Sequence, residues 1–194
     1  MRSSRAAFAG ALAPVVRSAL ESALVNALPR LGPPGIPGSP RILGSYAAMD
    51  DEIDPQALEQ AAIAAGWQIA FPRVTANVSG EGPLSFHIAA YEALTPGYKG
   101  IAEPPASAPL VRPDALLVPL LAVDRAGNRL GQGKGHYDRT LAALRADGPV
   151  FALGLAWDMQ LLDALPAQPW DQPLDAIATP TLFHTPPPRA KAGA

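Results

Sequence analysis

The chain has 194 residues, no cysteine, three histidines and a formal net charge of −2. The missing cysteines exclude disulfide frameworks, thiolate zinc sites and cysteine nucleophiles, and the near-neutral charge argues against a nucleic-acid partner. Because 48% of the residues are hydrophobic, disorder is not expected. The length predicts a single domain over residues 1–185, followed by a flexible tail over residues 186–194.

No membrane segment is predicted. The longest apolar run, residues 115–123, is far shorter than the ~20 residues of a spanning helix and is interrupted by Pro119. Residues 6–16 resemble a signal peptide only faintly, because they have no strongly apolar centre and are followed by Arg17 and Glu21 at helical spacing. We therefore expect a cytoplasmic protein with no membrane partner.

The first half of the chain predicts helices and short strands. Residues 5–28 favour helix, with Pro14 starting a second helical segment. A proline-rich loop follows over residues 29–40, and then a strand over residues 41–46. Asp54 is expected to cap a helix that has Pro55 in its first turn and ends at Gly66. Residues 67–71 predict a strand that Pro72 terminates.

The second half alternates strands and helices. Strands are expected over residues 84–90, 115–118, 150–156 and 176–179, with a loop over residues 95–113 and a helix over residues 140–145. The run at residues 115–118 has no polar alternation, which is typical of a central parallel strand. This order predicts an α/β fold with a mostly parallel sheet that is covered on both faces.

Most of the chemistry lies between Asp124 and Arg139, after a buried strand and before a helix. Three alternating glycines (Gly131, Gly133 and Gly135) allow close approach of the backbone to a ligand, and successive N–H groups before a helix form an anion cradle. Lys134 and Arg129 add positive charge, and Asp138 adds a carboxylate that could hold Mg²⁺. We expect phosphate binding here, against the alternative of a glycine-rich turn with a solvated lysine.

Two well-known phosphate motifs do not match this loop. Asn128 stands where the Walker A motif has its first glycine, and Gly135 follows Lys134 in place of serine or threonine. His136 stands where the dinucleotide-binding motif has its third glycine. The loop is therefore not a standard nucleotide motif.

Residues 117–124 and 127–139 closely resemble the signature of the 5-formyltetrahydrofolate cyclo-ligase family, also called methenyltetrahydrofolate synthetase. Further similar segments follow in the family's order, at residues 49–54, 71–74, 97–104, Gln160 and 170–175. The resemblance covers residues 41–179 and implies a three-layer α/β/α Rossmann-like fold. It also implies that ATP and Mg²⁺ are used to convert 5-formyltetrahydrofolate to 5,10-methenyltetrahydrofolate, with release of ADP and phosphate.

The implied mechanism begins with attack of the formyl oxygen on the γ-phosphate of ATP, followed by ring closure through N10. His136 stands where many members have tyrosine, and Met1 stands where they have an N-terminal lysine, for which Arg2 could substitute. These departures motivate a non-catalytic folate- or nucleotide-binding homologue as the alternative. A third possibility is an ATP-dependent or sugar-phosphate enzyme with another substrate on the same scaffold.

The resemblance also assigns residues. Lys134 and Arg129 are the expected catalytic cations, and Asp138 and Asp171 are the expected Mg²⁺ ligands. The expected ATP-binding residues are Arg5, Arg129, Leu130, Gly131, Gln132, Gly133, Lys134, Gly135, His136 and Tyr137. The expected folate-binding residues are Ala47, Glu52, Gln132, Gly133, Lys134, Gly135 and His136. Small molecules are thus the expected partners, and the protein is expected to be a monomer.

Several of these residues have plainer alternatives. Glu52 could belong to a solvated acidic turn before a helix, and Asp171 could be a turn aspartate with Asp175 as its competitor for the metal. Tyr137 could stack on a ligand ring or pack beneath the loop, and Arg73 could contact the folate tail or pair with an acidic neighbour.

Three further residues outside the loop have a simpler assignment. Trp67 and Trp157 are expected in the core rather than in the site, and Gln160 is a weak candidate for lining the site.

Overall fold

The structure is a computed structural model that describes residues 1–32, 40–74 and 82–188. Its helices are α1 (Arg2–Ala11), α2 (Pro14–Ser22), the 3₁₀ helix η1 (Ala23–Arg30), α3 (Gln56–Ala64) and α4 (His136–Asp147). Pro14 is the first residue of α2, where its missing N–H needs no partner, so the predicted second helical segment is confirmed. Residues 33–39 of the predicted proline-rich loop and 189–194 of the predicted tail lie outside the described residues.

A mixed sheet of eight strands forms the centre of the described part of the chain, in the order β13-β12-β10-β7-β1-β2-β3-β6. The five strands from β12 to β2 are parallel, and the three outer strands pair antiparallel to their neighbours. The bounds are β1 (Ile42–Gly44), β2 (Gln68–Val74), β3 (Leu84–Ile88), β6 (Leu110–Val111), β7 (Ala115–Pro119), β10 (Phe151–Leu155), β12 (Ala176–Ala178) and β13 (Phe183–His184).

Several short strands and 3₁₀ helices lie outside the central sheet. β8 (Ala122–Asp124), β9 (Arg129–Leu130) and β11 (Leu161–Leu162) form a three-stranded sheet, and β4 (Thr95–Pro96) pairs with β5 (Ala102–Glu103). The short 3₁₀ helices are η2 (Tyr91–Ala93), η3 (Tyr98–Gly100) and η4 (Asp158–Gln160). The loop predicted over residues 95–113 therefore contains three short strands, which are too brief to leave a periodic pattern in the sequence.

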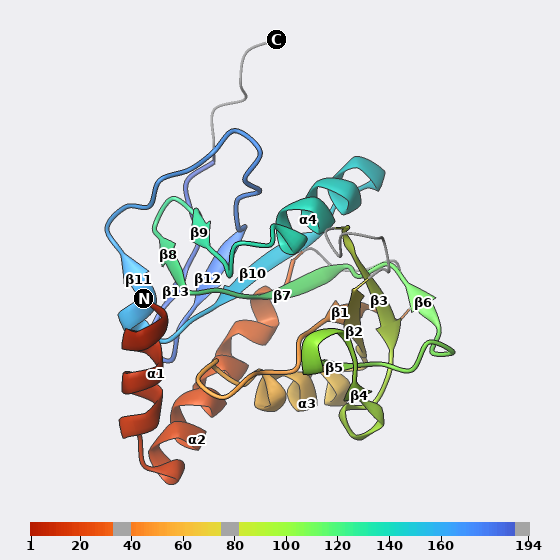
Figure 1. The fold of residues 1–194 in the computed structure, drawn as a ribbon, viewed down its shortest axis with the longest axis horizontal. Coiled ribbons are helices and arrows are strands. Elements are labelled where there is room, and N and C mark those ends of the chain that lie inside the picture. Colours follow the sequence, from red (N-terminus) through yellow and green to blue (C-terminus); the bar gives the residue numbers. More distant parts are fainter. Residues whose placement is uncertain (33–39, 75–81, 189–194) are drawn as a thin grey trace.

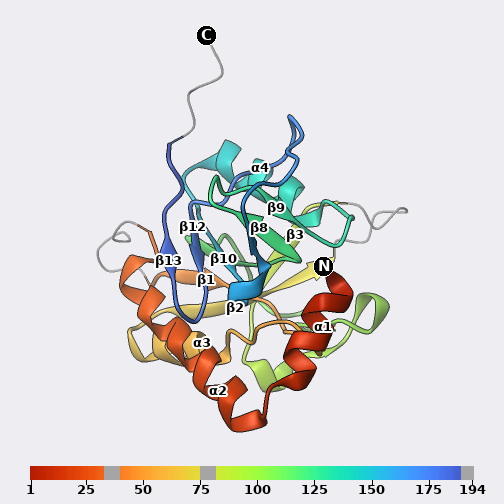
Figure 2. The same cartoon turned by 90° about the vertical axis from the view of Figure 1, so that its left-hand side faces the viewer.

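Helices cover both faces of the central sheet. Helices α1, α2 and α3 lie on one face and α4 lies on the other, as Figure 1 and the rotated view in Figure 2 show. The expected three-layer α/β/α arrangement with a mostly parallel sheet is thus confirmed. Because β1, β2 and β7 are parallel, their carboxyl ends lie at one edge of the sheet, where parallel α/β proteins bind ligands.

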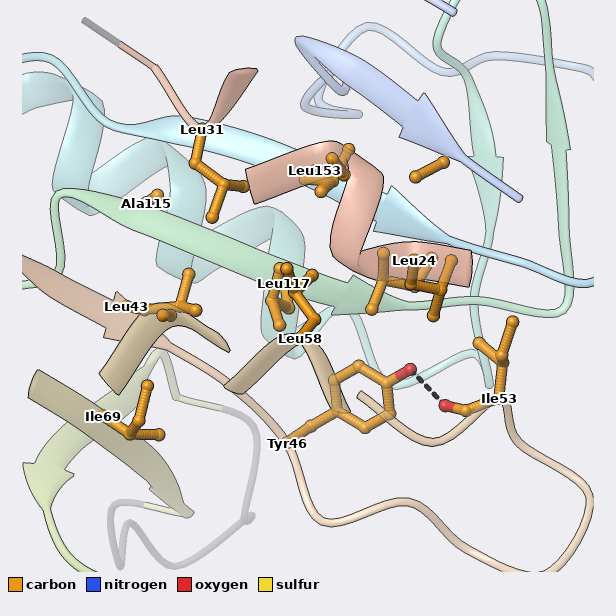
Figure 3. Close-up of a cluster of buried hydrophobic side chains, with 14 of the residues drawn as sticks. Leu24, Leu31, Leu43, Tyr46, Ile53, Leu58, Ile69, Ala115, Leu117 and Leu153 are labelled. Atoms are coloured by element: carbon orange, nitrogen blue, oxygen red, sulfur yellow. Dashed lines mark hydrogen bonds between the residues drawn. The ribbon is translucent and has the colours of Figure 1, made fainter. Parts of the chain in front are cut away.

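Two apolar clusters, one on each side of β7, form the core. Residues from η1 and α3 pack over β1, β7 and β10 in the first cluster (Figure 3): Leu24, Leu31, Leu43, Leu58, Leu117 and Leu153. Leu116 and Val118 of β7 face the second cluster, together with Leu141 of α4. Residues 115–118 are all fully buried, because successive side chains of β7 point into opposite clusters. This explains the absence of polar alternation in that strand.

The expected end of β2 was wrong. Pro72 does not end β2, which continues to Val74. The Gln68 N–H donates to Arg41 O (2.8 Å) and Ala70 O accepts from the Ser45 N–H (2.8 Å), so even-numbered residues of β2 face β1. Because β1 ends at Gly44, Pro72 lies beyond its partner and has no ladder hydrogen bond to lose.

The helix expected over residues 140–145 starts earlier, at His136. Gly135 precedes it in the left-handed region (φ 63°), and Thr140 Oγ1 donates to His136 O (2.7 Å) while accepting the Leu84 N–H (2.8 Å). This long-range contact with β3 anchors the first turn.

The start of α3 also differs from the expected one. The helix after Asp54 has its cap at Pro55, although Asp54 Oδ1 still accepts the Gln56 N–H (2.9 Å).

Among the described residues, no single helix combines the length and apolar character needed to cross a membrane. The bent pair Arg2–Ala11 and Pro14–Arg30, whose parts differ in direction by 112°, meets that test only by length and composition.

Candidate active site

A cavity of about 1080 Å³ lies at the carboxyl ends of β1, β2 and β7. Three stretches of chain form most of its wall: the segment after β1, the segment after β7, and the glycine-rich loop between β9 and α4. All predicted site residues except Arg5 line it, namely Ala47, Glu52, Arg129, Leu130, Gly131, Gln132, Gly133, Lys134, Gly135, His136, Tyr137, Asp138 and Asp171. The fold thus brings together residues that are up to 124 positions apart in the chain.

The glycine-rich loop (residues 131–135) is open toward the cavity. Gly133 and Gly135 have positive φ angles of 87° and 63°, a conformation that other residues adopt only with strain. A Cβ atom added at Gly131 or Gly133 would contact no other part of the protein. The backbone of the loop is therefore bare, as a surface that approaches a phosphate closely must be.

The charged groups of the loop differ in exposure. Lys134 is exposed, and its carbonyl accepts a hydrogen bond from the Arg139 guanidinium, which braces the loop against α4. Lys134 lines the cavity and forms no ion pair with any residue that the structure describes, so its ammonium is available to an anionic ligand. His136 Nδ1 lies 3.0 Å from Gly82 O, so this ring nitrogen is hydrogen-bonded within the protein.

Arg129 and Asp138 form a partly buried ion pair (Nη2–Oδ1 2.7 Å) at the cavity wall. The same Oδ1 atom accepts the Gln172 N–H (3.0 Å), and Arg129 Nη1 donates to Gln172 O. Burial lowers the pKa of Arg129, and the neighbouring carboxylates of Asp138 and Asp171 oppose that change. Arg129 thus connects β9, α4 and the turn that carries Asp171.

Asp171 closes a tight turn and also lines the cavity. Its Oδ2 atom accepts the Gln168 N–H (2.7 Å), and its own N–H donates to Gln168 O (3.1 Å). Asp175 is instead bonded to Arg145 (3.0 Å) and to the Ala152 N–H (2.7 Å), and does not line the cavity.

The carboxylates at the cavity wall suit a cation that takes only some of its ligands from the protein. No group of three or more His, Asp or Glu side chains within residues 1–32, 40–74 and 82–188 could hold a metal ion. Mg²⁺ is commonly held by one or two carboxylates and completed by water and substrate phosphates. Asp138 and Asp171, beside the bare loop, fit that pattern.

Glu52 is buried at the part of the cavity wall that follows β1, with only 6% of its surface exposed. Its Oε2 atom accepts the Met49 N–H (3.1 Å), and its Oε1 atom lies 3.4 Å from Gln132 Nε2 and 3.6 Å from Arg5 Nη1. Burial raises the pKa of Glu52, although these donors oppose the shift. The alternative of a solvated acidic turn is therefore wrong for Glu52, because its carboxylate faces the cavity and not bulk water.

Arg5 does not line the cavity. It is 3% exposed and donates to Asp51 Oδ2 (2.8 Å), Asp51 Oδ1 (3.0 Å) and Leu120 O (3.1 Å). The hydrogen bonds from Arg5 hold the pKa of the Asp51 carboxyl below its usual value. Arg2 does reach the cavity, where its Nη2 atom donates to Gln132 Oε1 (3.0 Å). The N-terminal helix therefore supports both Glu52 and the glycine-rich loop.

Arg73 and Gln160 make hydrogen bonds within the fold and are not part of the cavity wall. Arg73 pairs with Glu103 (3.7 Å) and donates to Pro104 O, as the second alternative for it predicted. Gln160 is buried and bonded to Leu120 O (2.8 Å), Leu121 O (3.2 Å) and the Trp157 N–H (2.8 Å), and it lies outside the cavity wall.

Three aromatic residues are also placed by the structure. Trp157 and Trp67 are core residues, at 0% and 8% exposure, as expected. Tyr137 packs against the second core cluster and also lines the cavity, and burial raises its pKa.

The sequence analysis gave no role to several wall residues: Tyr46, Met49, Tyr98, Arg139 and Trp170. Tyr46 and Met49 follow the carboxyl end of β1, so their position after a parallel strand was the available signal. Arg139 is the last residue of the signature segment, and its bond to Lys134 O could not be inferred from spacing.

Comparison with known proteins agrees with this geometry. Residues 40–180 match the 5-formyltetrahydrofolate cyclo-ligase family, and a 5-formyltetrahydrofolate cyclo-ligase from Mycolicibacterium smegmatis is 34% identical over 152 residues, which are 75% of this chain and 77% of that protein. The chain belongs to the 5-formyltetrahydrofolate cyclo-ligase family. The family member of that name from Escherichia coli is 48% identical over 75 residues. That match spans 38% of this chain and 40% of the relative's length.

Solved structures of the family share the fold. The 5,10-methenyltetrahydrofolate synthetase from Aquifex aeolicus superposes with a TM-score of 0.72 at 25% identity, covering 100% of this chain and 94% of the other. The corresponding protein from Mycoplasma pneumoniae has a TM-score of 0.64 at 22% identity, covering 92% of this chain and 96% of the other. The arrangement of layers described above is thus that of the family.

Proposed function

We propose that this protein converts 5-formyltetrahydrofolate to 5,10-methenyltetrahydrofolate, using ATP and Mg²⁺ and releasing ADP and phosphate. The observation that carries the proposal is that the bare, lysine-bearing loop and the buried Glu52 carboxylate face one cavity of about 1080 Å³. That volume is at the upper limit of roughly 300–1,000 Å³ for single-ligand pockets, which leaves room for a folate and a nucleotide together.

Glu52 is proposed to bind the pterin ring. A carboxylate can accept two hydrogen bonds from the N–H groups of a pterin edge. Its present donors, the Met49 N–H and the Gln132 amide, fix its orientation before the substrate enters. Gln132 is itself held by Arg2 (3.0 Å), and Ala47 supplies apolar surface beside it.

The glycine-rich loop is proposed to bind the triphosphate of ATP through residues 129–137. Lys134 supplies a mobile positive charge to the γ-phosphate, and Arg129 acts from the wall, where it also orients Asp138 (2.7 Å). Mg²⁺ held by Asp138 and Asp171 would neutralise phosphate charge. The position of Arg5 supports an indirect role, because its guanidinium is bonded to Asp51 and Leu120.

In the proposed reaction the formyl oxygen attacks the γ-phosphate, and ADP leaves. N10 then attacks the activated carbon, and phosphate departs as the ring closes. The formyl oxygen is a poor leaving group until it is phosphorylated, so the work of the protein is to align the two substrates and to neutralise charge on the transferred phosphoryl group. Residues 1–185 are proposed to do this as a single domain, in a cytoplasmic monomer.

The test is a coupled measurement of two products. Purified protein with 5-formyltetrahydrofolate, ATP and Mg²⁺ is expected to form the methenyl chromophore and ADP in equal amounts. Asp138→Asn is expected to shift the Mg²⁺ titration of this activity to higher concentrations. Absence of both products from a folded protein that binds its substrates would overturn the proposal.

A non-catalytic binding homologue is the second candidate, since His136 replaces the tyrosine of many members and donates toward Gly82 O. It predicts binding of 5-formyltetrahydrofolate and ADP without turnover. Restoration of activity by His136→Tyr in an otherwise inactive protein would favour this candidate and identify its cause.

A further inference from the structure

One large aromatic side chain is exposed at the cavity. Trp170 is 68% exposed and lines the cavity wall. The other two tryptophans of the chain, Trp67 and Trp157, are buried at 8% and 0%. Single exposed apolar residues are common, but an exposed indole at the wall of a ligand cavity offers a flat surface for a ring.

The backbone around Trp170 is held in place. Asp171 and Gln168 exchange two hydrogen bonds across the turn that contains it (2.7 and 3.1 Å). The next residue, Gln172, donates to Asp138 Oδ1 (3.0 Å) and accepts from Arg129. The indole is therefore carried by a turn that is bonded on its far side to the ion pair of the phosphate loop.

These bonds assign Trp170 to the nucleotide side of the cavity. The turn of Trp170 is bonded through Gln172 to Arg129 and Asp138, which belong to β9 and α4. The proposed pterin-binding residue Glu52 is instead bonded to the Met49 N–H and to Gln132 at the start of the loop. Figure 1 shows the segment after β11 running beside β9 and α4. A ring that stacks on Trp170 would thus extend from phosphates bound at the glycine-rich loop.

We propose that Trp170 stacks on the adenine base of ATP. This inference rests on the proposed function, since it requires ATP at the glycine-rich loop. Purine bases stack well on indole, and removal of such a platform by alanine weakens binding by about tenfold. The phosphates are bound by other residues, so a ligand without a base should not depend on Trp170.

The test compares ligands with and without the base. Calorimetry with the full chain and Mg²⁺ would measure Kd for ADP and for inorganic triphosphate in wild type, Trp170→Ala and Trp170→Phe. The expected result is a Kd for ADP that is about tenfold higher in Trp170→Ala and close to wild type in Trp170→Phe, with the triphosphate unaffected. Leu110→Ala is the matched control, because Leu110 is also 68% exposed but does not line the cavity.

Fluorescence gives a second readout. Because the other tryptophans are buried, ADP is expected to quench the emission of Trp170 in wild type and to leave the emission of Trp170→Phe unchanged. An equal Kd for ADP in wild type and Trp170→Ala would overturn the adenine assignment alone. So would a loss confined to 5-formyltetrahydrofolate, which would transfer Trp170 to the folate. Failure of wild type to bind either ADP or triphosphate would overturn the proposed function together with it.

Discussion

The two sides of the cavity are built in opposite ways. On the side that follows β1, Glu52 and its neighbour Arg5 are 6% and 3% exposed. Arg5 of α1 donates to Asp51 and to Leu120 O, and Glu52 accepts the Met49 N–H. On the other side, residues 131–134 are exposed, and two of their glycines contact nothing at the Cβ position. The side chains of the first side are thus held by hydrogen bonds within the protein, whereas the second side presents bare backbone to a ligand.

Because of this difference, substitutions on the two sides should affect the free energy of unfolding and the reaction rate differently. Substitutions on the buried side are expected to change the free energy of unfolding as well as binding, because they leave charges unpaired. Substitutions in the exposed loop are expected to change rate with little effect on stability. The predictions below test this separation, in order of decreasing effect.

The largest effect is expected for Arg5→Met on the buried side. Removing one partner of a buried charge network costs about 3–5 kcal/mol, and here both Asp51 and Glu52 lose their guanidinium partner. Denaturant unfolding measures the loss. Arg2→Met is the control, because its bond to Gln132 is exposed, and less than about 1 kcal/mol is expected.

Arg5→Lys addresses the alternative role of this residue. If Arg5 contacts ATP directly, the lysine variant would raise KM for ATP while the protein stays folded. An unchanged KM for ATP, with reduced stability, would support the structural role. A fully stable Arg5→Met variant would contradict the buried network.

In the exposed loop, Lys134→Ala is expected to lower kcat by ~100-fold or more, as expected for loss of a charge that stabilises the transferring phosphoryl group. The melting temperature should stay within about 1–2 °C of wild type, since surface substitutions change stability by roughly 0.5 kcal/mol or less. Lys134→Arg should recover part of the rate. An unchanged kcat in Lys134→Ala would remove this residue from the phosphate site.

Glu59, on α3 behind the buried side, provides a pH-dependent test. It is 4% exposed and accepts a hydrogen bond from Ser45, and burial raises its pKa from 4.5 to about 7. Folding favours the protonated form of Glu59. The contribution of Glu59 to the free energy of unfolding is therefore fully present below pH 4.5 and is lost as the pH rises through about 7. The full loss corresponds to about 3 kcal/mol.

Glu59→Gln is therefore expected to be more stable than wild type by about 3 kcal/mol at pH 8 and nearly equal at pH 4.5. The glutamine amide keeps an oxygen that accepts from Ser45. Chemical denaturation at both pH values measures the difference. A gain of the same size at both would show that Glu59 does not titrate in this range.

The smallest effect is expected for Glu52→Gln. Its amide offers one accepting oxygen in place of two, so KM for 5-formyltetrahydrofolate should rise by about tenfold, a loss of one charge-assisted hydrogen bond, with KM for ATP unchanged. Glu59→Gln is the matched control, because Glu59 is also a buried glutamate but does not line the cavity. Equal KM values for both variants would contradict the pterin assignment.

Local patterns in the sequence predicted several parts of this architecture. The unbroken apolar run at residues 115–118 predicted the central strand β7, and Pro14 predicted the start of α2. The three alternating glycines around Lys134 predicted the bare loop before a helix, since positive φ angles and close approach depend on the residue itself. Such features follow from the properties of neighbouring residues, so they can be inferred without the fold.

The burial and pairing of charges depended on the tertiary structure. Asp50, Asp51 and Glu52 form an acidic run that is typical of a solvated turn, yet Glu52 is buried because the strand order β2-β1-β7 brings it against Gln132, 80 residues away. Arg5 meets Leu120 O across 115 residues for the same reason. Periodicity reports which face of an element is apolar, but which charge meets which partner is decided by strand order and by the burial that this order imposes.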